Sequence, residues 1–425
     1  MTAPDAGPTE VRDRRVIERG PGYRSGLRDL PRNLNVSTIG AAVVAAVFGC
    51  TGPALIIING AEKAGLSPTA TASWIFGVYV FGGLNSLLLA LYYKQPIVGA
   101  WSIPGAVLVV DALGTYSLSE LVGAYLVTSL LVILAALTGV VRRVMSWLPF
   151  PIVMAMIAGA LIKFAISVVE SGTATPWIVA AAVLGYLVFA RFVRKIPGVV
   201  GALVAGIMVA AVTGGFSGAG FDGGLTAPEL VLPTFDAGAV LAVSIPLAIL
   251  VLGAENAQAI GTLMAADYRP PVNSMSLLSG VSGALAAAFG GHTANIAGPM
   301  TAICTSRDAG PTEGRYAASV LNGTIFMAFG LLSGAAVAVV TALPSELVAA
   351  VAGLAMITVL LSAFQGAFRA SRFQVGSLFA LVIAMSGVSI LGISSPFWAL
   401  IGGVGASLLL ERDHFGDRAQ QPATK

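Results

Sequence analysis

The chain has 425 residues, of which 56% are hydrophobic and 10% are Asp, Glu, Lys or Arg, whereas about 25% of residues are charged in an ordinary soluble domain. This composition excludes a water-soluble globule and favours a protein that lies mostly in a membrane. The net charge is +3, but seven arginines lie in the first 32 residues. Membrane topology explains this clustering, so we expect no nucleic-acid partner.

Residues 1–35 precede the first apolar run. They contain neither an apolar core of roughly 7–15 residues nor the small-residue cleavage site of a signal peptide. We therefore expect them to form a flexible cytoplasmic tail.

Apolar runs of about 20 residues, the length that an α-helix needs to cross a bilayer, recur along the chain. In the first half we expect spans near residues 36–58, 70–92, 98–114, 118–140, 150–170, 176–193 and 197–214. These spans, within residues 36–214, make up the first of two repeats.

A Gly-rich stretch without Lys or Arg, residues 215–237, is expected to be an external loop. The second repeat, residues 238–411, is expected to contain spans near 238–259, 272–289, 291–306, 315–342, 346–366, 373–391 and 394–410. Residues 412–425 then form a second cytoplasmic tail. The fold class is an all-α polytopic membrane protein with about fourteen spans.

Basic residues test this count, because cytoplasmic loops are enriched in Lys and Arg. With the N-terminus inside, only Lys63 and Lys163 fall outside the predicted cytoplasmic segments. Besides the basic residues of the tails, those segments contain Lys94, Arg142, Arg143, Arg191, Arg194, Lys195, Arg269, Arg307, Arg315, Arg369, Arg372 and Arg412.

Seven spans per half is an odd number, so the second half enters the membrane in the opposite orientation. We therefore expect two inverted seven-span repeats, a design in which substrate binds near the midplane beside broken helices. The broken spans are 3 and 10. They contain Gly99-Ala-Trp-Ser-Ile-Pro-Gly-Ala-Val-Leu108 and Gly290-Gly-His-Thr-Ala-Asn-Ile-Ala-Gly-Pro-Met-Thr301.

Pro104 and Pro299 suit the first position of a short helix that follows an extended stretch. The N-termini of two such half-helices would face each other near the midplane. Their unpaired N–H groups and positive dipole ends favour an anion. The alternative is a pair of Pro-kinked helices that serve packing alone.

Glu255 and Asp111 are the carboxylates most clearly within the predicted hydrocarbon. Ionisable residues are costly there and are retained mainly where they line a polar cavity, form pairs or relay protons. Glu255 is the candidate for proton coupling, the alternative being a structural hydrogen bond between helices. Asp111 lies near the outer end of its span, where it can reach interfacial water.

Four further polar residues lie near these positions. Gln258 follows Glu255 by three residues and can share its helix face, whereas Asn256 need not. In the broken span, Asn295 is expected to bind substrate, and His292 could titrate near neutral pH or hydrogen-bond a backbone carbonyl. The sequence leaves open whether Asp111 or His292 takes part in coupling.

Enzyme signatures are missing, since the chain has no P-loop, no nucleophile elbow and no zinc-protease motif. The two histidines, His292 and His414, cannot build a multi-histidine metal site. We expect no enzymatic activity, no metal and no cofactor. Cys50 and Cys304 lie in apolar spans, where packing is the default role.

Three motifs resemble the benzoate/proton symporter family: Gly-Ala-Glu-Asn-Ala-Gln at 253–258, Tyr-Arg-Pro-Pro-Val-Asn at 268–273 and Phe-Gly-Gly-His-Thr-Ala-Asn-Ile-Ala-Gly-Pro-Met-Thr-Ala-Ile-Cys at 289–304. The likeness extends from Leu30 to Leu410. The layout is more distantly similar to uracil and xanthine permeases and to sulfate-transporter-like anion carriers. In the nucleobase permeases, glutamates on spans 8 and 10 bind the base. Glu255 matches the first, whereas Ala294 occupies the second position.

The resemblance implies a core of spans 1–4 and 8–11 and a gate of spans 5–7 and 12–14. It also implies a homodimer in the bacterial inner (plasma) membrane, in contact with the lipid bilayer, with both termini cytoplasmic. A site with one fewer carboxylate suits an anion, so the implied function is secondary active import of benzoate or a similar aromatic carboxylate with protons.

The expected proton-coupling residues are Glu255 and His292. The expected substrate-binding residues, at the half-helix N-termini and on span 8, are Ser102, Ile103, Gly105, Glu255, Gln258, Thr293, Asn295, Ala297 and Gly298. Two alternatives remain: a nucleobase or inorganic-anion transporter of the same fold, and a passive anion channel.

Overall fold

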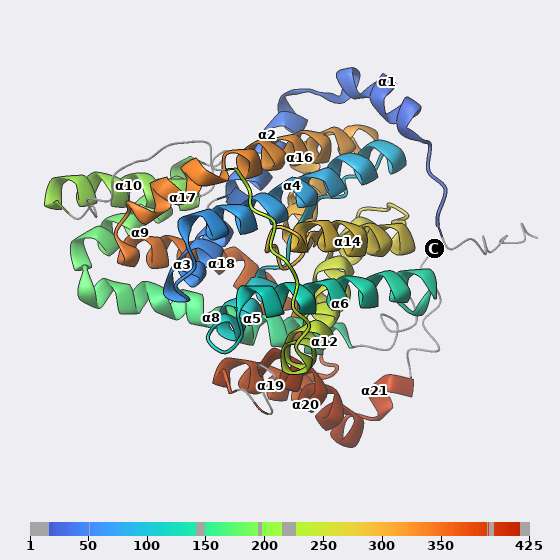
Figure 1. Cartoon of the computed structure of the whole chain (residues 1–425). Coiled ribbons are helices and arrows are strands. Elements are labelled where there is room, and N and C mark those ends of the chain that lie inside the picture. Colours follow the sequence, from blue (N-terminus) through green and yellow to red (C-terminus); the bar gives the residue numbers. More distant parts are fainter. Residues whose placement is uncertain are drawn as a thin grey trace, which may run out of the picture.

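Helices dominate the molecule, as the apolar runs predicted (Figure 1). The computed structural model describes residues 17–50, 52–141, 149–193, 198–214, 227–388, 390 and 395–416. In the first half the elements are α1 (Tyr23–Asn33), α2 (Val36–Cys50), α3 (Gly52–Lys63), α4 (Pro68–Tyr93), β1 (Gly99–Ala100), α5 (Ile103–Leu113), α6 (Leu118–Leu137), α8 (Phe150–Ala174), α9 (Pro176–Phe192) and α10 (Gly198–Thr213).

The second half begins with a helix of changing pitch. It consists of α11 (Ala237–Ala239), the π-helical η1 (Val240–Ser244), α12 (Ile245–Ile249), the π-helical η2 (Leu250–Asn256) and α13 (Ala257–Ala265). There follow α14 (Val272–Ala287), β2 (Asn295–Ile296), α15 (Gly298–Thr305), the 3₁₀ turns η3 (Arg307–Ala309) and η4 (Thr312–Gly314), α16 (Tyr316–Leu331), α17 (Ser333–Thr341), α18 (Ser345–Phe368), α19 (Gln374–Ser386), α20 (Ser395–Leu410) and α21 (Asp413–Gly416).

Five stretches of the described chain are long and apolar enough to cross a membrane. They are Val36–Lys63, Pro68–Tyr93, Leu118–Leu137, Phe150–Ala174 and Ala237–Met264. Shorter apolar helices, such as Pro176–Phe192 and Val272–Ala287, accompany them. The count of fourteen spans stays a prediction.

Local sequence explains where several helices begin. The Ser67 side chain accepts a hydrogen bond from the Ala70 N–H at the start of α4, where Pro68 takes the first helical position. Ser117 and Glu120 form a reciprocal capping box at the start of α6. These contacts satisfy backbone donors that a helix leaves unpaired at its N-terminus.

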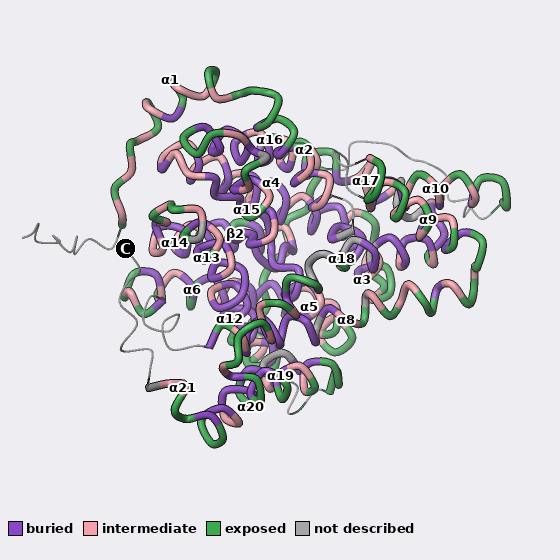
Figure 2. Tube along the Cα trace, turned by 180° about the vertical axis from the view of Figure 1, so that it is seen from behind, coloured by how far each residue is buried: buried purple, intermediate pink, exposed green. Residues whose placement is uncertain are grey.

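The helices pack in two groups. Helices α2, α4, α6, α14, α15 and α16 contact one another, and helices α8, α9, α10, α18, α19 and α20 do the same. Contacts between α3 and α18 and between α5 and α8 join the two groups. Figure 2 shows that buried segments gather around β2, α13 and α15, in the middle of the first group.

The expected flexible tail is partly wrong. Residues 1–16 lie outside the described part of the chain, but α1 is a helix that packs on α4. The Tyr316 hydroxyl donates to the Gly26 carbonyl at 2.8 Å. A Cβ added to Gly26 would lie 2.0 Å from the Leu91 carbonyl oxygen, so only glycine permits this approach.

The eleventh expected span, residues 315–342, is divided at Leu332 between α16 and α17. Leu332 adopts φ −97° and ψ 20°, outside the helical region. The flanking sequence Gly330-Leu-Leu-Ser-Gly334 contains the small residues at which helices bend. Its hydropathy is continuous, which is why the apolar run alone predicted one helix.

Candidate functional site

Strands β1 and β2 pair antiparallel, with Gly99 opposite Ile296 and Ala100 opposite Asn295. Each strand leads into a half-helix, β1 into α5 and β2 into α15. Helix α5 has 11 residues and α15 has 8, so they extend about 17 Å and 12 Å. Neither can cross about 30 Å of hydrocarbon alone. The broken spans therefore place two helix N-termini inside the protein.

Ser102 organises the start of α5. Its hydroxyl oxygen accepts a hydrogen bond from the Gly105 N–H at 3.0 Å, which makes it the helix cap. Its own N–H donates to the Thr293 hydroxyl oxygen at 3.0 Å. Thr293 comes from the other broken span, so the two breaks hold each other in place.

His292 is fully engaged by two neighbours. The Trp74 indole N–H donates to His292 Nδ1 at 3.0 Å, and His292 Nε2 lies 2.9 Å from the Ser102 carbonyl oxygen. An indole N–H can only donate, so Nδ1 must accept. The proton then lies on Nε2, which donates to the Ser102 carbonyl. In this arrangement His292 is a neutral brace between α4 and the start of α5.

The start of α15 lies against α13. Ala297 precedes the helix and donates its N–H to the Val98 carbonyl at 2.8 Å. Gly298 is the first helical residue, and Gln258 covers it so closely that an added Cβ would lie 2.5 Å from Gln258 Oε1. Gln258 is half-buried, and the missing side chain of Gly298 makes room for it.

Glu255 lies between the two half-helices. It is 6% exposed and belongs to the π-helical segment η2, a geometry that often marks functional sites in helices. Its carboxyl faces the backbone N–H groups of Gly298 and Ile103 and the Ser102 hydroxyl. One carboxyl group thus meets the N-termini of both half-helices.

The Asn295 side chain forms its hydrogen bond within strand β2 and not with the N-terminus of a half-helix. Its Nδ2 donates to the Ile296 carbonyl at 3.0 Å. Its Oδ1 is buried and has no hydrogen-bond partner among the described residues. Asn256 turns toward the same strand, where its Oδ1 accepts from the Ile296 N–H at 3.3 Å. All the predicted site residues thus belong to one buried cluster, but Asn295 lies in its strand layer.

Trp74 and three other residues position the broken spans and were not predicted from the sequence. The Asn85 side chain donates to the Ala294 carbonyl at 3.0 Å, and Ser86 accepts from the Gly99 N–H at 2.7 Å. Thr301 accepts from the Val98 N–H at 3.2 Å. Asn85 and Ser86 are polar residues within the apolar helix α4, and that signal could have identified them.

Asp111 lies apart from this cluster. It is exposed near the end of α5. Among the described residues, no group of three or more His, Cys, Asp or Glu side chains could hold a metal ion. Cys50 and Cys304 are free thiols.

An apolar cavity of about 360 Å³ lies where the two helix groups meet. Cys50 and Leu55 line it from span 1, Leu203 from α10, Phe329 from α16 and Val351 from α18. None of the expected substrate-binding residues is among the described residues that line this cavity.

The sequence matches one protein family over most of its length. The model of the benzoate membrane transport protein family covers residues 32–409. A curated relative, the benzoate membrane transport protein of Acinetobacter baylyi, is 28% identical over 385 residues, which are 90% of this chain and 98% of the relative. The inner membrane protein YdcO of Escherichia coli is 28% identical over 383 residues, 89% of this chain and 98% of that protein.

Solved structures share the fold. The transmembrane domain of a cyanobacterium bicarbonate transporter, BicA, superimposes with a TM-score of 0.61 at 16% identity, over 88% of this chain and 98% of that one. The murine Solute Carrier 26 family member A9 anion transporter, in its inward-facing state, gives a TM-score of 0.61 at 14% identity, over 91% of this chain and 70% of that one. The chain therefore has the fold of a membrane transporter.

Proposed function

Because the chain belongs to the family of benzoate membrane transport proteins, we propose that it imports benzoate or a similar aromatic carboxylate together with protons. The members of this family are transporters and not enzymes. The chain is a multi-pass protein of the bacterial inner membrane, as the name of the Escherichia coli relative states for that protein. The substrate and the coupling are the parts of this proposal that need support from the site.

The observation that carries the proposal is the position of the Glu255 carboxyl. It faces the N–H groups of Ile103 and Gly298, at the starts of α5 and α15. Two helix N-termini that converge on one point favour a negative charge there. Glu255 is thus a carboxylate held by the protein at the place where we propose that the substrate carboxylate binds.

This arrangement links proton binding to substrate binding. Ionised Glu255 competes with a substrate anion for the same N–H groups and repels it. A proton on Glu255 removes the negative charge and frees these donors for the substrate. Each ligand then raises the affinity for the other, which a symporter requires. The proton also offsets one negative charge that crosses the bilayer.

The remaining predicted residues take supporting roles in this proposal. Ser102, Ile103 and Gly105 present the N-terminus of α5, and Ala297 and Gly298 present that of α15. Gln258 and Thr293 hold the edges of the site, and Asn295 and His292 hold the broken segments. His292 stays a proton-coupling candidate only if its two hydrogen bonds open during transport.

We also propose the architecture around this site. Residues 36–214 and 238–411 are two inverted repeats of seven spans, and residues 215–237 are external. Both termini are cytoplasmic, and two chains form a homodimer. Import then follows from movement of the first helix group against the second, with the site near their junction.

Transport of an inorganic anion is a second candidate, favoured by the fold shared with a bicarbonate transporter and an anion transporter. A nucleobase is disfavoured, because Ala294 stands where the nucleobase permeases carry a glutamate.

Uptake into proteoliposomes distinguishes these substrates. Purified protein is tested with labelled benzoate, uracil, bicarbonate and sulfate, with and without an inward pH gradient. We expect accumulation of benzoate that requires the gradient. Equal benzoate uptake without it, equilibrating but never concentrating, would identify a passive channel.

The matched variants are Glu255→Gln and Asp111→Asn, which neutralise the two carboxylates of the predicted hydrocarbon. We expect Glu255→Gln to abolish gradient-driven accumulation while it retains benzoate binding, since the amide mimics the protonated acid. Asp111→Asn, at an exposed helix end, keeps accumulation. Parent-like accumulation by Glu255→Gln rules out this carboxyl as the coupling group.

A further inference from the structure

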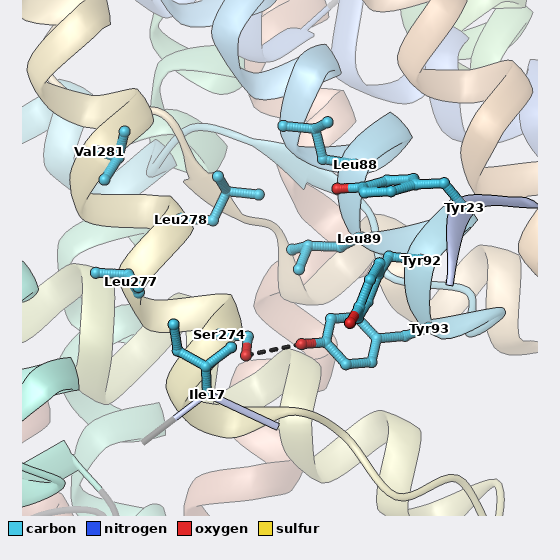
Figure 3. A pocket seen from close by; sticks show the side chains of 10 residues that line it. All are labelled: Ile17, Tyr23, Leu88, Leu89, Tyr92, Tyr93, Ser274, Leu277, Leu278 and Val281. Atoms are coloured by element: carbon cyan, nitrogen blue, oxygen red, sulfur yellow. Dashed lines mark hydrogen bonds between the residues drawn. The ribbon is translucent and has the colours of Figure 1, made fainter. Parts of the chain in front are cut away.

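An apolar groove lies between α4 and α14, away from the transport site (Figure 3). Its volume is about 270 Å³. Leu88 and Leu89 of α4 form one wall, and Leu277, Leu278 and Val281 of α14 form the other. Val281 is 41% exposed, so the groove opens toward the outside of the helix bundle. In a protein that spans a membrane, this side of the bundle faces lipid chains.

The N-terminal segment closes one end of the groove with polar contacts. Ile17 lies beside Ser274, whereas Tyr23 lies beside Leu88 and contacts the ring of Tyr92 edge-on (Figure 3). The Glu18 carboxylate accepts hydrogen bonds from the Asn273 and Ser274 N–H groups at 2.9 Å and 3.0 Å. The groove thus passes from apolar walls to an end where the Tyr93 hydroxyl donates to the Ser274 hydroxyl at 2.8 Å, as expected at a membrane interface.

Two arginines, Arg19 and Arg24, belong to the same N-terminal segment as Ile17 and Tyr23. Arg24 directly follows Tyr23, Arg19 comes two residues after Ile17, and both arginines are exposed. Within the described residues, neither side chain forms an ion pair or a hydrogen bond. By contrast, Arg28 pairs with Asp29 at 3.0 Å. Glu18, the nearest acid in sequence, is already held by the start of α14. Among the residues that the structure describes, no acidic side chain therefore pairs with the positive charges of Arg19 and Arg24.

We propose that the groove binds one acyl chain of an anionic phospholipid, whose phosphate is bound by Arg19 and Arg24. The wall from Ser274 to Val281 extends about 10 Å along α14, which accommodates part of an acyl chain. The apolar walls select a lipid rather than a soluble anion. The two arginines favour an anionic headgroup, because a zwitterionic lipid adds a cation beside them. The bound lipid fastens the N-terminal segment to α4 and α14.

The test compares lipids on the purified full-length chain in a neutral detergent. Phosphatidylglycerol, phosphatidylcholine with the same acyl chains, and glycerol phosphate are titrated. Bound lipid is counted by native mass spectrometry, and the apparent Tm is measured in parallel. We expect one phosphatidylglycerol per chain, bound at least about tenfold more tightly than phosphatidylcholine, since charge-assisted hydrogen bonds have such an effect. Glycerol phosphate leaves the Tm unchanged.

Two variants test the two halves of the site separately. Arg19→Ala with Arg24→Ala removes the headgroup partners and should abolish the preference for phosphatidylglycerol. Leu278→Trp fills the groove and should reduce binding of both lipids. The matched control is Arg369→Ala with Arg412→Ala, which removes two exposed arginines from the second helix group and leaves binding unchanged.

Three results would overturn the proposal. Equal stabilisation by glycerol phosphate would identify a site for soluble anions. Equal binding of the two lipids by the parent would leave the arginines without a role. An unchanged preference in the arginine variant would place the headgroup elsewhere. The arginine variant alters only exposed side chains that pair with none of the described residues, so its result stands even if Leu278→Trp fails to fold.

Discussion

The hydrogen-bond donors and acceptors around Glu255 and His292 determine where each of these two side chains can carry a proton. Among the described residues, Glu255 faces neutral donors alone, so its carboxyl can gain a proton without losing an ion-pair partner there. His292 accepts at Nδ1 from Trp74 and donates at Nε2 to Ser102. A second proton on His292 would have to displace the Trp74 N–H. At the residue scale, Glu255 is therefore the better proton carrier and His292 the better brace.

Replacement of Trp74 by Phe tests the brace. Trp74→Phe keeps an aromatic ring but leaves His292 Nδ1 without a donor, which should cost about 1–3 kcal/mol of stability. We expect a lower apparent Tm and slower uptake, with the dependence on the pH gradient unchanged. The exposed Trp177 provides the control Trp177→Phe, which should match the parent. A changed pH dependence of uptake in Trp74→Phe would instead assign proton transfer to His292.

Gly298 gives a second prediction at this scale. A Cβ at Gly298 would lie 2.5 Å from Gln258 Oε1, so Gly298→Ala must displace Gln258, at a cost of about 1–3 kcal/mol. We expect benzoate affinity to fall by about ten- to a hundred-fold. Gly261→Ala is the control, because nothing lies within 4 Å of its added Cβ. The added Cβ would also lie 2.6 Å from the Gln258 Cβ, which Gln258→Ala keeps and Gln258→Gly removes. Added Gln258→Gly should therefore restore part of the affinity, and its failure to do so would contradict the steric explanation.

Carboxylates from one element cap the N-terminus of another in two places. Glu18 caps α14, as described above. Glu411, which follows α20, accepts from the Val375 and Gly376 N–H groups at the start of α19, each at 3.0 Å. Desolvation, the largest single influence, raises the pKa of Glu411. The hydrogen bonds from Ser407 and from these two N–H groups together outweigh it and lower the pKa below its ordinary value of 4.5. Helices α19 and α20 are thus joined by a charged cap.

Acid titration of the Tm tests this cap. Because the folded-state pKa of Glu411 is lowered, its stabilisation is fully present above about pH 4.5 and is lost as the pH falls below that value. Glu411→Gln should lower the apparent Tm at pH 7 and should approach the parent at low pH. Glu170→Gln, at an exposed acid, should follow the parent throughout. A constant difference between Glu411→Gln and the parent at all pH values would contradict a role for the charge.

The sequence predicted the helices and the broken spans better than it predicted the contacts between them. Apolar runs and Gly-Pro punctuation placed the broken spans, since extended segments followed by Pro104 and Pro299 leave few other conformations. The π-helical turns of η2 were not predicted, because a wider helical turn has no signature in hydropathy. The pairing of Trp74 with His292 was also missed, since these residues are 218 positions apart. Such contacts depend on packing between helices rather than on local pattern.

At the scale of the whole molecule, the basic residues show how charge is distributed between the two predicted sides of the membrane. Lys94 binds Asp29 of α1 at 2.7 Å, and Arg315 donates to the Gly310 and Thr305 carbonyls at 2.8 Å. Both contacts lie at the side predicted to be cytoplasmic. Lys163, one of the two basic residues that the positive-inside count left unexplained, lies in α8 within electrostatic range of Asp111. Residues 142–148 and 194–197, with Arg142, Arg143, Arg194 and Lys195, lie outside the described chain.

The proposed topology is tested by labelling single cysteines in intact cells. The background lacks Cys50 and Cys304, so each introduced thiol reports alone. Two inverted repeats of seven spans place the loops at 142–149, 191–196, 307–314 and 369–372 in the cytoplasm and residues 215–237 outside. Leu232 is 81% exposed in the external stretch, and Arg369 is exposed at the end of α18.

We expect a membrane-impermeant maleimide to label Leu232→Cys in intact cells and to label Arg369→Cys only after the cells are opened. Both variants must label equally in opened cells, which controls for the reactivity of each thiol. An odd number of spans per half is what makes the repeats inverted. Labelling of Arg369→Cys from outside would therefore change the span count of the second half, and the two half-helices could no longer enter from opposite sides of the membrane.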